Sequence, residues 1–313
     1  MTQTIFDNFG IKQNNDLFDV FMPCGYKTAE SQLNKINFKN KKIYAIKGCD
    51  KIVSKNNLWI LLSNRYGRKK AKTIMPETYL FNDEDILLFK KNFNKNFYIL
   101  KNNKQRKKGI TITNNLNQIL KSDNKLIQEY KKSFIINKRK FNLRLYILII
   151  CENKSKKIYL HDYSKCLYTS KDFVSLSNFD ENITNSYKTD NNIYIKNPYT
   201  INDLYRYLDK NGYSSDLLKI KIKKIISLLA SVIIEPVCNL EKLNSNKTFQ
   251  LFGMDILVDE NLDPYILELN KGPDMNPKDK RDELLKKKVL EDVFDRTNII
   301  NIKSKNLFKQ IHI

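Results

Sequence analysis

The hydrophobic positions of the chain repeat with two different periods, which predicts a mixture of strands and helices. Alternating or wholly apolar short runs predict strands at residues 41–48, 76–81, 97–101, 110–114, 126–130, 140–150 and 158–161. Apolar residues three or four positions apart predict helices at 49–66, 82–91 and 280–294, a short one from Asn202, and a longer one capped by Ser214 or Ser215. Residues 170–198, rich in Asn, Ser and Asp, predict a long loop.

The segment FQLFGMDILVDENLDPYILELN has the pattern of a β-hairpin, because two apolar runs flank a polar turn. If the turn is centred on Asn261 and Leu262, Asp255 lies opposite Glu268, and the period of two places Asn270 on the same face as Glu268. Facing carboxylates in an apolar hairpin repel one another and lose solvation, and a bound cation reverses that cost. Oxygen ligands without a nearby His or Cys suit Mg²⁺ rather than Zn²⁺. The alternative is a solvated edge hairpin whose acidic residues face water.

The predicted strand KFNLRLYILII carries an unusual polar face. Alternation places Lys140, Asn142 and Arg144 on one face and apolar side chains on the other. A buried cationic face needs anions, such as phosphate or the carboxylates of the hairpin. An edge strand with one wet face would show the same pattern.

Two further basic segments and one histidine have local interpretations. The loop NNKQRKKG at 102–109 joins two predicted strands, an arrangement that can lay cationic side chains over a polyphosphate. The cluster RKKAK at 68–72 has the pattern of a solvated face, and His161, alone among apolar residues, that of a structural residue.

Length and charge limit the classes of protein to consider. A chain of 313 residues can bury a substantial core and form one to three domains. A net charge of +22 favours an acidic partner such as nucleic acid, an anionic membrane or an acidic polypeptide. The excess of Lys, Asn and Ile would also follow from an AT-rich genome. Only 8 glycines are present, without a GxGxxG or GxxxxGK[ST] motif, which argues against a Rossmann or Walker phosphate loop.

The cysteines and the apolar runs indicate the cellular compartment in which the protein is expected. The 5 cysteines form no CxxC pair and there are only 2 His, so we expect no zinc site and reduced thiols. The N-terminus lacks an apolar signal core, and the longest apolar runs are too short to span a bilayer. We therefore expect a soluble cytoplasmic protein without a membrane partner.

Seven segments, together with the hairpin, resemble the tubulin–tyrosine ligase family of the ATP-grasp superfamily of carboxylate–amine ligases. They are GCDKIVSKNNL (48–58), MPETY (75–79), YILK (98–101), LIQEY (126–130), KFNLRLYIL (140–148), ITN (183–185) and the long helix before the hairpin. Their order and spacing match the family over roughly residues 47–294, which is far more specific than one motif.

The resemblance implies an α+β, ATP-grasp fold with antiparallel sheets and flanking helices. The expected divisions are a small N-terminal domain at 1–48, a central domain at 49–130, and a C-terminal domain at 131–313 that carries the metal site and a C-terminal helix. The nucleotide is expected between the central and C-terminal domains.

The resemblance also implies a role for each matching residue. Asp255, Glu268 and Asn270 match magnesium ligands, and Arg144 matches a catalytic arginine near the transferred phosphoryl group and the amino-acid substrate. The implied nucleotide-binding residues are Lys51 and Lys101 near the phosphates, Gln128, Glu129 and Tyr130 at the adenine hinge, Lys140 and Asn142, and Thr184 and Asn185 near ribose and phosphate.

Four departures from the family pattern bear on activity. Asn142 stands where an Asp is usual, so the amide can form hydrogen bonds but carries no charge. The loop RKKG at 106–109 keeps one glycine where two are usual. Leu167 stands in place of an arginine that helps to hold the substrate, which removes a bidentate carboxylate contact. Asn182 replaces a His.

The activity implied is ATP- and Mg²⁺-dependent ligation of a free amino acid (Tyr, Glu or Gly) to a protein tail, through an acyl phosphate. The expected acceptor is the acidic tail of tubulin or a similar tail, toward which the positive chain would be attracted. The alternative is a catalytically degenerate relative that binds microtubules or other polyanions, which Leu167 and the thinned glycine loop favour. Nucleic acid is not an expected partner, since no basic motif is interleaved with aromatic residues.

Overall fold

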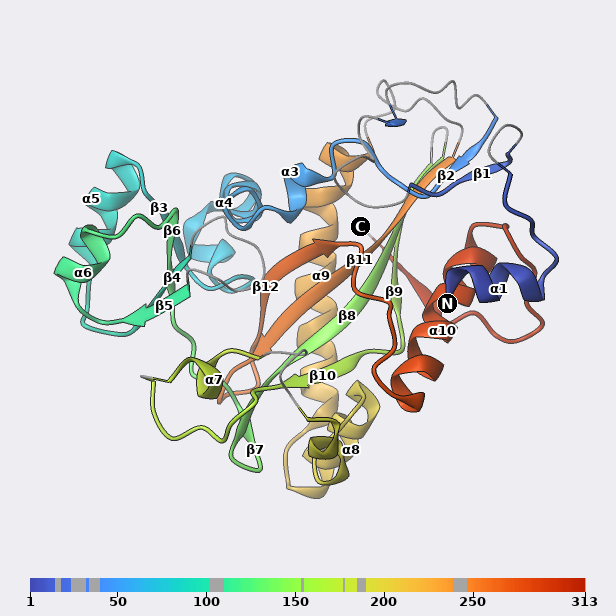
Figure 1. Cartoon of the computed structure of the whole chain (residues 1–313). Coiled ribbons are helices and arrows are strands. Elements are labelled where there is room, and N and C mark those ends of the chain that lie inside the picture. The colour runs from blue at the N-terminus through green and yellow to red at the C-terminus, as the bar shows by residue number, and fades with distance from the viewer. Residues whose placement is uncertain are drawn as a thin grey trace.

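Two β-sheets with flanking helices organise the protein (Figure 1). The computed structural model describes residues 1–14, 18–23, 32–33, 40–101, 110–152, 155–176, 178–184, 190–238 and 247–312. The helices are α1 (Thr2–Asn8), α3 (Asp50–Val53), α4 (Lys55–Ala71), α5 (Asp83–Asn92), α6 (Leu116–Leu120), α7 (Phe179–Asn182), the 3₁₀ helix η1 (Asn191–Ile195), α8 (Ile201–Lys210), α9 (Ser215–Val237) and α10 (Lys280–Arg296). The α+β class expected from the resemblance agrees with this mixture.

The larger sheet has nine strands within the described residues. They are β1 (Val20–Phe21), β2 (Lys42–Ile43), β7 (Ile135–Ile136), β8 (Arg139–Glu152), β9 (Ser155–His161), β10 (Lys165–Tyr168), β11 (Lys247–Val258), β12 (Pro264–Lys271) and β13 (Phe308–Ile311). Their order is β1-β2-β11-β8-β9-β13, with β12 paired to β11 and with β7 and β10 paired to β8. The pairs of β2 with β1 and β11 are parallel, and the others are antiparallel.

The smaller sheet lies to one side of the larger one and is entirely antiparallel (Figure 1). Its strands are β3 (Thr78–Leu80), β4 (Tyr98–Lys101), β5 (Ile110–Thr113) and β6 (Leu126–Glu129), in the order β3-β6-β4-β5. Its core packs Tyr79 and Tyr98 against Phe89 of α5 and Ile119 of α6. The predicted cap of α5 is confirmed, because the Asn82 side chain accepts the Asp85 N–H at 2.8 Å.

Strand β8 separates two hydrophobic cores. Its odd-numbered apolar residues, such as Leu145 and Ile147, belong to a core with α9, whereas Tyr146 and Leu148 belong to a core with α10 and α1. Helix α9 begins after Ser214, whose hydroxyl accepts the Leu217 N–H at 3.2 Å. Because both faces of β8 are covered over most of its length, the polar face at its beginning is held on a rigid strand.

Arginine 68 connects α4 to the smaller sheet. Its guanidinium lies over the rings of Trp59 and Tyr79, with centroid distances of 5.2 and 4.6 Å. It also donates to Asp85 Oδ1 and to the Thr78 carbonyl, each at 2.9 Å. The helix changes direction just before it, at Gly67, where φ is +73°.

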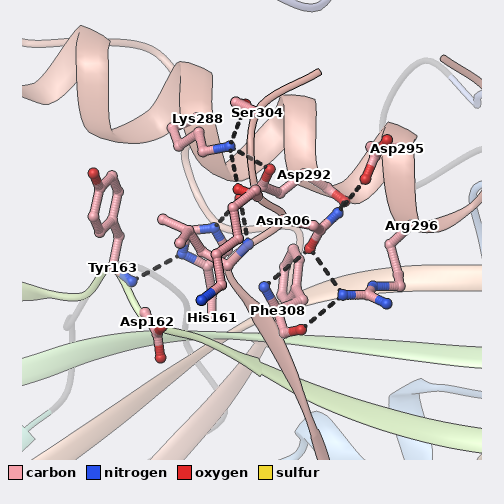
Figure 2. A network of polar contacts seen from close by, with 12 residues as sticks. His161, Asp162, Tyr163, Lys288, Asp292, Asp295, Arg296, Ser304, Asn306 and Phe308 are labelled. Atoms are coloured by element: carbon pink, nitrogen blue, oxygen red, sulfur yellow. Dashed lines mark hydrogen bonds and ion pairs between the residues drawn. The ribbon is translucent and has the colours of Figure 1, made fainter. Parts of the chain in front are cut away.

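A buried network fixes the C-terminal strand (Figure 2). Asp292 of α10 lies 3.0 Å from His161 Nε2 and accepts the Lys288 ammonium at 2.7 Å. Asp292 also accepts a hydrogen bond from the N–H of Leu307, the residue just before β13, at 3.0 Å. The expectation that His161 is structural agrees with this position, in which Nδ1 accepts the Tyr163 N–H at 2.9 Å.

Most predicted elements are present, with shifted ends. The strand expected at 41–48 is limited to Lys42 and Ile43, and the short helix begins after Thr200 rather than at Asn202. The edge-strand interpretation of 140–150 is wrong, because β8 has β11 on one side and β9 and β10 on the other. Strand β10, a four-residue strand just before the polar region at 170–198, was not predicted from the sequence.

The cysteines differ from the prediction. Cys151 of β8 and Cys238 at the end of α9 form a disulfide, with their Cα atoms 5.4 Å apart, so the expectation of reduced thiols is wrong for this pair. The fold brings together two positions that are 87 residues apart, which spacing alone does not reveal. Cys49 and Cys166 are buried thiols, and Cys24 lies outside the described residues.

Candidate active site

Three charged side chains form a row across the larger sheet. Arg144 of β8 is the register partner of Asp255 of β11, and Asp255 is the register partner of Glu268 of β12. The predicted pairing of Asp255 with Glu268 is thereby confirmed. The register shifts between Asp255 and Ile256, which leaves Leu267 as the extra residue of a bulge. Such bulges are common beside functional sites, where they re-aim side chains.

Arg144 and Asp255 form a bidentate ion pair. Arg144 Nε donates to Asp255 Oδ1 at 2.5 Å, and Nη2 donates to Oδ2 at 3.0 Å. Burial opposes the charge of Arg144, but the Asp255 carboxylate outweighs it and raises the pKa of the guanidinium. The arginine stem crosses Gly253, where an added Cβ would lie 3.1 Å from Arg144 Cδ and 3.0 Å from Pro273 Cβ. A side chain at this position would therefore force Pro273 or Arg144 to move by a few tenths of an ångström.

Glu268 lies among cations from three elements. Lys55, at the start of α4, is 3.5 Å from its carboxylate. Burial alone would raise the pKa of Glu268, but Lys55, Lys101 and Arg144 together hold it below its usual value. Lys101 belongs to β4 of the smaller sheet, so a cation of one sheet lies within electrostatic range of a carboxylate of the other. The alternative of acidic side chains that simply face water does not describe the hairpin.

The donor set of Asp255, Glu268 and Asn270 suits a hard cation. Asn270 pairs in register with Gly253, one step along the same face, and its amide donates to Glu268 Oε1 at 3.4 Å. The Asn270 side-chain oxygen and the two carboxylates therefore supply oxygen ligands only, as Mg²⁺ prefers. The excess of positive charge around Glu268 equally suits the phosphates with which Mg²⁺ usually binds.

Lys101 is held in place by the smaller sheet. Its ammonium donates to Gln128 Oε1 at 2.5 Å, and Gln128 Nε2 donates to Thr78 Oγ1 at 2.9 Å. Burial, assisted by Lys55, lowers the pKa of Lys101 to about 8, whereas Glu268 opposes this change. A buried ammonium whose pKa is lowered by desolvation is ready to gain an anionic partner.

Lys140 forms a second buried cationic position. Its ammonium donates to Asn182 Oδ1 at 2.6 Å and to the Tyr130 hydroxyl, and it lies 3.7 Å from the centre of the Phe173 ring. Burial lowers the pKa of Lys140 to about 8. Asn182 therefore takes part in this position as an acceptor.

Of the other expected nucleotide-binding residues, some lie in contact with one another and some do not. Asn142 donates to Thr184 Oγ1 at 3.0 Å, which brings these two together. Glu129 uses its N–H to bind the Glu77 carbonyl at 2.8 Å, and its side chain pairs with Lys131. Lys51 is exposed on α3 and forms no side-chain ion pair with any described residue. Asn185 and the basic loop at 102–109 lie outside the described residues.

The sequence did not identify Lys55 as a site residue. A lysine in the first turn of a helix is unfavourable next to the positive end of the helix dipole. Lys55 directly follows the cap residue Ser54, and this unfavourable position was the available signal that a carboxylate lies nearby. Glu268 is that carboxylate, and it offsets the repulsion from the helix dipole.

Comparisons with known proteins identify the family of the chain. The model of the tubulin–tyrosine ligase family matches residues 33–307, so the chain belongs to that family. It is 27% identical over 288 residues to tubulin monoglutamylase TTLL4 of Mus musculus, which covers 84% of this chain and 24% of that protein. It is 26% identical to TTLL4 of Homo sapiens, with coverage of 94% and 26%.

A second group of relatives consists of polyglutamylases. The chain is 26% identical over 223 residues to tubulin polyglutamylase ttll-5 of Caenorhabditis elegans, which covers 64% of this chain and 30% of that protein. The chain thus spans about a quarter of the length of these curated relatives. Within the described residues, no helix is long and apolar enough to cross a membrane.

Proposed function

We propose that the protein is an ATP- and Mg²⁺-dependent carboxylate–amine ligase that adds glutamate to an acidic protein tail. The observation that carries the proposal is the row Arg144, Asp255 and Glu268, which Lys101 of the smaller sheet approaches. The nucleotide would bind between the two sheets, that is, between the predicted central and C-terminal domains.

In this proposal the lysines bind the nucleotide. Lys101 and Lys140 are buried ammonium groups that gain solvation and charge balance from phosphate oxygens. Asp255, Glu268 and Asn270 would hold Mg²⁺, which spreads the charge of the transferred phosphoryl group. Gln128 positions Lys101, and Thr184 positions Asn142.

The bond changes follow from the chemistry of a carboxylate. A carboxylate of the acceptor tail attacks the γ-phosphorus, the bond to ADP breaks, and an acyl phosphate forms. The α-amine of glutamate then attacks the acyl carbon, phosphate leaves, and the amine releases a proton. Arg144 would stabilise the negative charge that develops on the acyl phosphate and on the tetrahedral intermediate.

The choice of glutamate and of tubulin as acceptor rests on the relatives, which are named tubulin monoglutamylases and polyglutamylases. The net charge of +22 supports an acidic acceptor, because it would accelerate encounter with a polyanionic tail.

Incubation with labelled glutamate, ATP, Mg²⁺ and tubulin tests the proposal. We expect label in intact tubulin, none in tubulin whose tails have been removed by protease, and none with the Asp255→Asn variant. Absence of label with Glu, Tyr and Gly alike would contradict the ligase function.

A binding protein without catalysis is the second candidate, because Leu167 is buried and apolar at a position where the family has an arginine. Salt-sensitive co-sedimentation with microtubules, combined with no ATP binding by calorimetry, would select it.

A further inference from the structure

Lys165 begins β10 directly opposite Arg144. The register pairs Lys165 with Arg144 and Leu167 with Asn142. Because register partners in an antiparallel pair point to the same side of the sheet, Lys165 and Leu167 share the face that carries Arg144 and Asn142. The row of charged side chains therefore continues from Glu268 through Asp255 and Arg144 to Lys165.

Lys165 is buried in an ion cluster, with 7% of its side chain exposed. Its ammonium is 2.9 Å from Asp282 Oδ1, and Lys286 is 2.9 Å from Asp282 Oδ2. The Asp282 and Lys286 side chains are 0% and 6% exposed. Two buried ammonium groups thus share one buried carboxylate.

The surrounding groups do not make Lys165 necessary for Asp282. Lys286 already gives Asp282 a partner four residues away in α10, and the Tyr199 hydroxyl donates to it at 3.1 Å. Burying a second ammonium costs free energy unless a further anion is present. The closeness of Lys286 adds to the effect of burial in lowering the pKa of Lys165, although Asp282 and Asp279 oppose this.

The cluster adjoins the candidate active site. The Tyr146 hydroxyl lies within electrostatic range of Arg144, Asp255, Asp274 and Asp282. The segment between β12 and α10 runs beside both places. Its Pro273 lies next to Gly253 and Arg144, while the Asn276 carbonyl accepts the Lys286 ammonium at 2.7 Å. The segment itself carries two acidic residues, Asp274 and Asp279, and one basic residue, Lys278.

We propose that Lys165, beside Arg144, binds a carboxylate of the amino acid that is ligated. It supplies the positive charge that Leu167, two residues further along the same face, does not. The inference rests on the proposed ligase function and names the residue that recognises its amino-acid substrate. It makes Lys165 specific for the amino acid rather than for ATP.

The test compares Lys165→Met with Lys286→Met, a matched control that removes the other ammonium from Asp282. We expect Lys165→Met to raise KM for glutamate roughly tenfold to a hundredfold, the value of one charge-assisted hydrogen bond, with KM for ATP unchanged. Lys286→Met should lower Tm and leave KM for glutamate unchanged. The double variant Lys165→Met/Leu167→Arg should recover most of the glutamate affinity, because it returns a cation to this face.

Equal effects of Lys165→Met and Lys286→Met on KM for glutamate would overturn the proposal and make Lys165 a tether for α10. So would a parallel rise in KM for ATP. With glutamine as substrate, an undiminished effect of Lys165→Met assigns the α-carboxylate, and a lost effect assigns the side-chain carboxylate.

Calorimetric titration of glutamate into protein with Mg²⁺ and a non-hydrolysable ATP analogue separates this inference from the ligase function. Glutamate binding that depends on Lys165, without ligation, would sustain the inference and reject the ligase. Unimpaired ligation by the Lys165→Met variant would support the ligase function and reject the role of Lys165. Absence of both glutamate binding and ligation would reject the ligase function and the role of Lys165 together.

Discussion

Arg144 and Asp255 occupy the same rung of adjacent strands, and the guanidinium donates to both oxygens of the carboxylate. The pair is held by two covered strands rather than by loops, so its geometry is fixed before any substrate arrives. The side chains of Arg144 and Asp255 are 21% and 13% exposed, so the pair is less accessible to solvent than a surface ion pair.

Replacement of Asp255 by Asn is expected to destabilise the protein as well as to abolish ligation. The Arg144 guanidinium would lose a charged acceptor in a partly buried place, which lowers the free energy of unfolding by about 2 kcal/mol. Urea denaturation measures this loss. Asp263→Asn in the same hairpin is the control, because Asp263 is 46% exposed and should change stability by less than about 0.5 kcal/mol. Equal losses in the two variants would contradict the importance of the pair.

Gly253→Ala tests the packing of the Arg144 stem. The added methyl group would lie 3.0 Å from Pro273 Cβ and 3.1 Å from Arg144 Cδ, so one of them must move. We expect a loss of about 1 kcal/mol in stability and a larger loss in kcat than in ATP affinity, because the arginine moves while the lysines stay. Steady-state kinetics at varied ATP would show this. An unchanged kcat would mean that the strand accommodates the methyl group.

ATP affinity should depend on pH through Lys101 and Lys140. Both have a pKa lowered to about 8 by burial, so both lose their charge as pH rises through this value. We expect ATP to bind roughly tenfold more weakly at pH 9.5 than at pH 7, as measured by displacement of a fluorescent nucleotide. Lys101→Arg should reduce this dependence, since arginine keeps its charge. A constant affinity in the wild-type protein would contradict the prediction.

A rise in pH that weakens ATP binding through Lys101 and Lys140 should increase the contribution of these two lysines to folding stability. Unfolding returns each lysine from about 8 to its ordinary pKa of 10.5, so the unfolded state binds more protons between these values. The contribution of these lysines to stability therefore rises with pH across this window.

Arg68→Ala should weaken the connection between α4 and the smaller sheet. The variant removes two hydrogen bonds at 2.9 Å and the contacts with the Trp59 and Tyr79 rings. A loss of about 2 kcal/mol is expected from thermal or urea unfolding. Arg65→Ala is the matched control, because Arg65 is exposed on the same helix. If both variants lose equally, the connection is not specific to Arg68.

Asp292→Ala should release the C-terminal strand (Figure 2). The variant leaves His161, Lys288 and the Leu307 N–H without their shared acceptor, at an expected cost of about 3 kcal/mol. Hydrogen exchange should accelerate in β13 more than in β11. Glu291→Ala, which removes the neighbouring carboxylate, is the control and should leave β13 protected. Unchanged exchange in β13 would show that other contacts hold the strand.

The part of the site that could be predicted depends on local periodicity. The hairpin pattern and a period of two predict Asp255 opposite Glu268, and the structure pairs these two residues. The bulge at Leu267 could not be predicted. Near the turn Leu257 pairs with Tyr265, one residue away from the predicted register, and the bulge restores the pairing of Asp255 with Glu268.

The part that could not be predicted depends on contacts distant in sequence. Alternation in β8 is the same for an edge strand and a central strand, and only the neighbours β9 and β11 distinguish them. Lys165 gave no signal as a buried residue, since its partner Asp282 is 117 positions away. Lys55 of α4 likewise meets Glu268 of β12 only in the folded chain, where the two lie 3.5 Å apart.

In its first half, strand β8 places Lys140, Asn142 and Arg144 on the face of the candidate site and Phe141 and Leu143 in the core with α9, and its second half lies between two cores. Substitutions at Asn142 or Arg144 therefore fall at the end of a strand that is anchored elsewhere, and those at Leu145 or Ile147 disturb the packing around α9. This separation lets a lineage change the molecule it recognises while the scaffold persists. Asn142 and Leu167, which the resemblance predicts to depart from the family pattern, lie opposite one another on this scaffold.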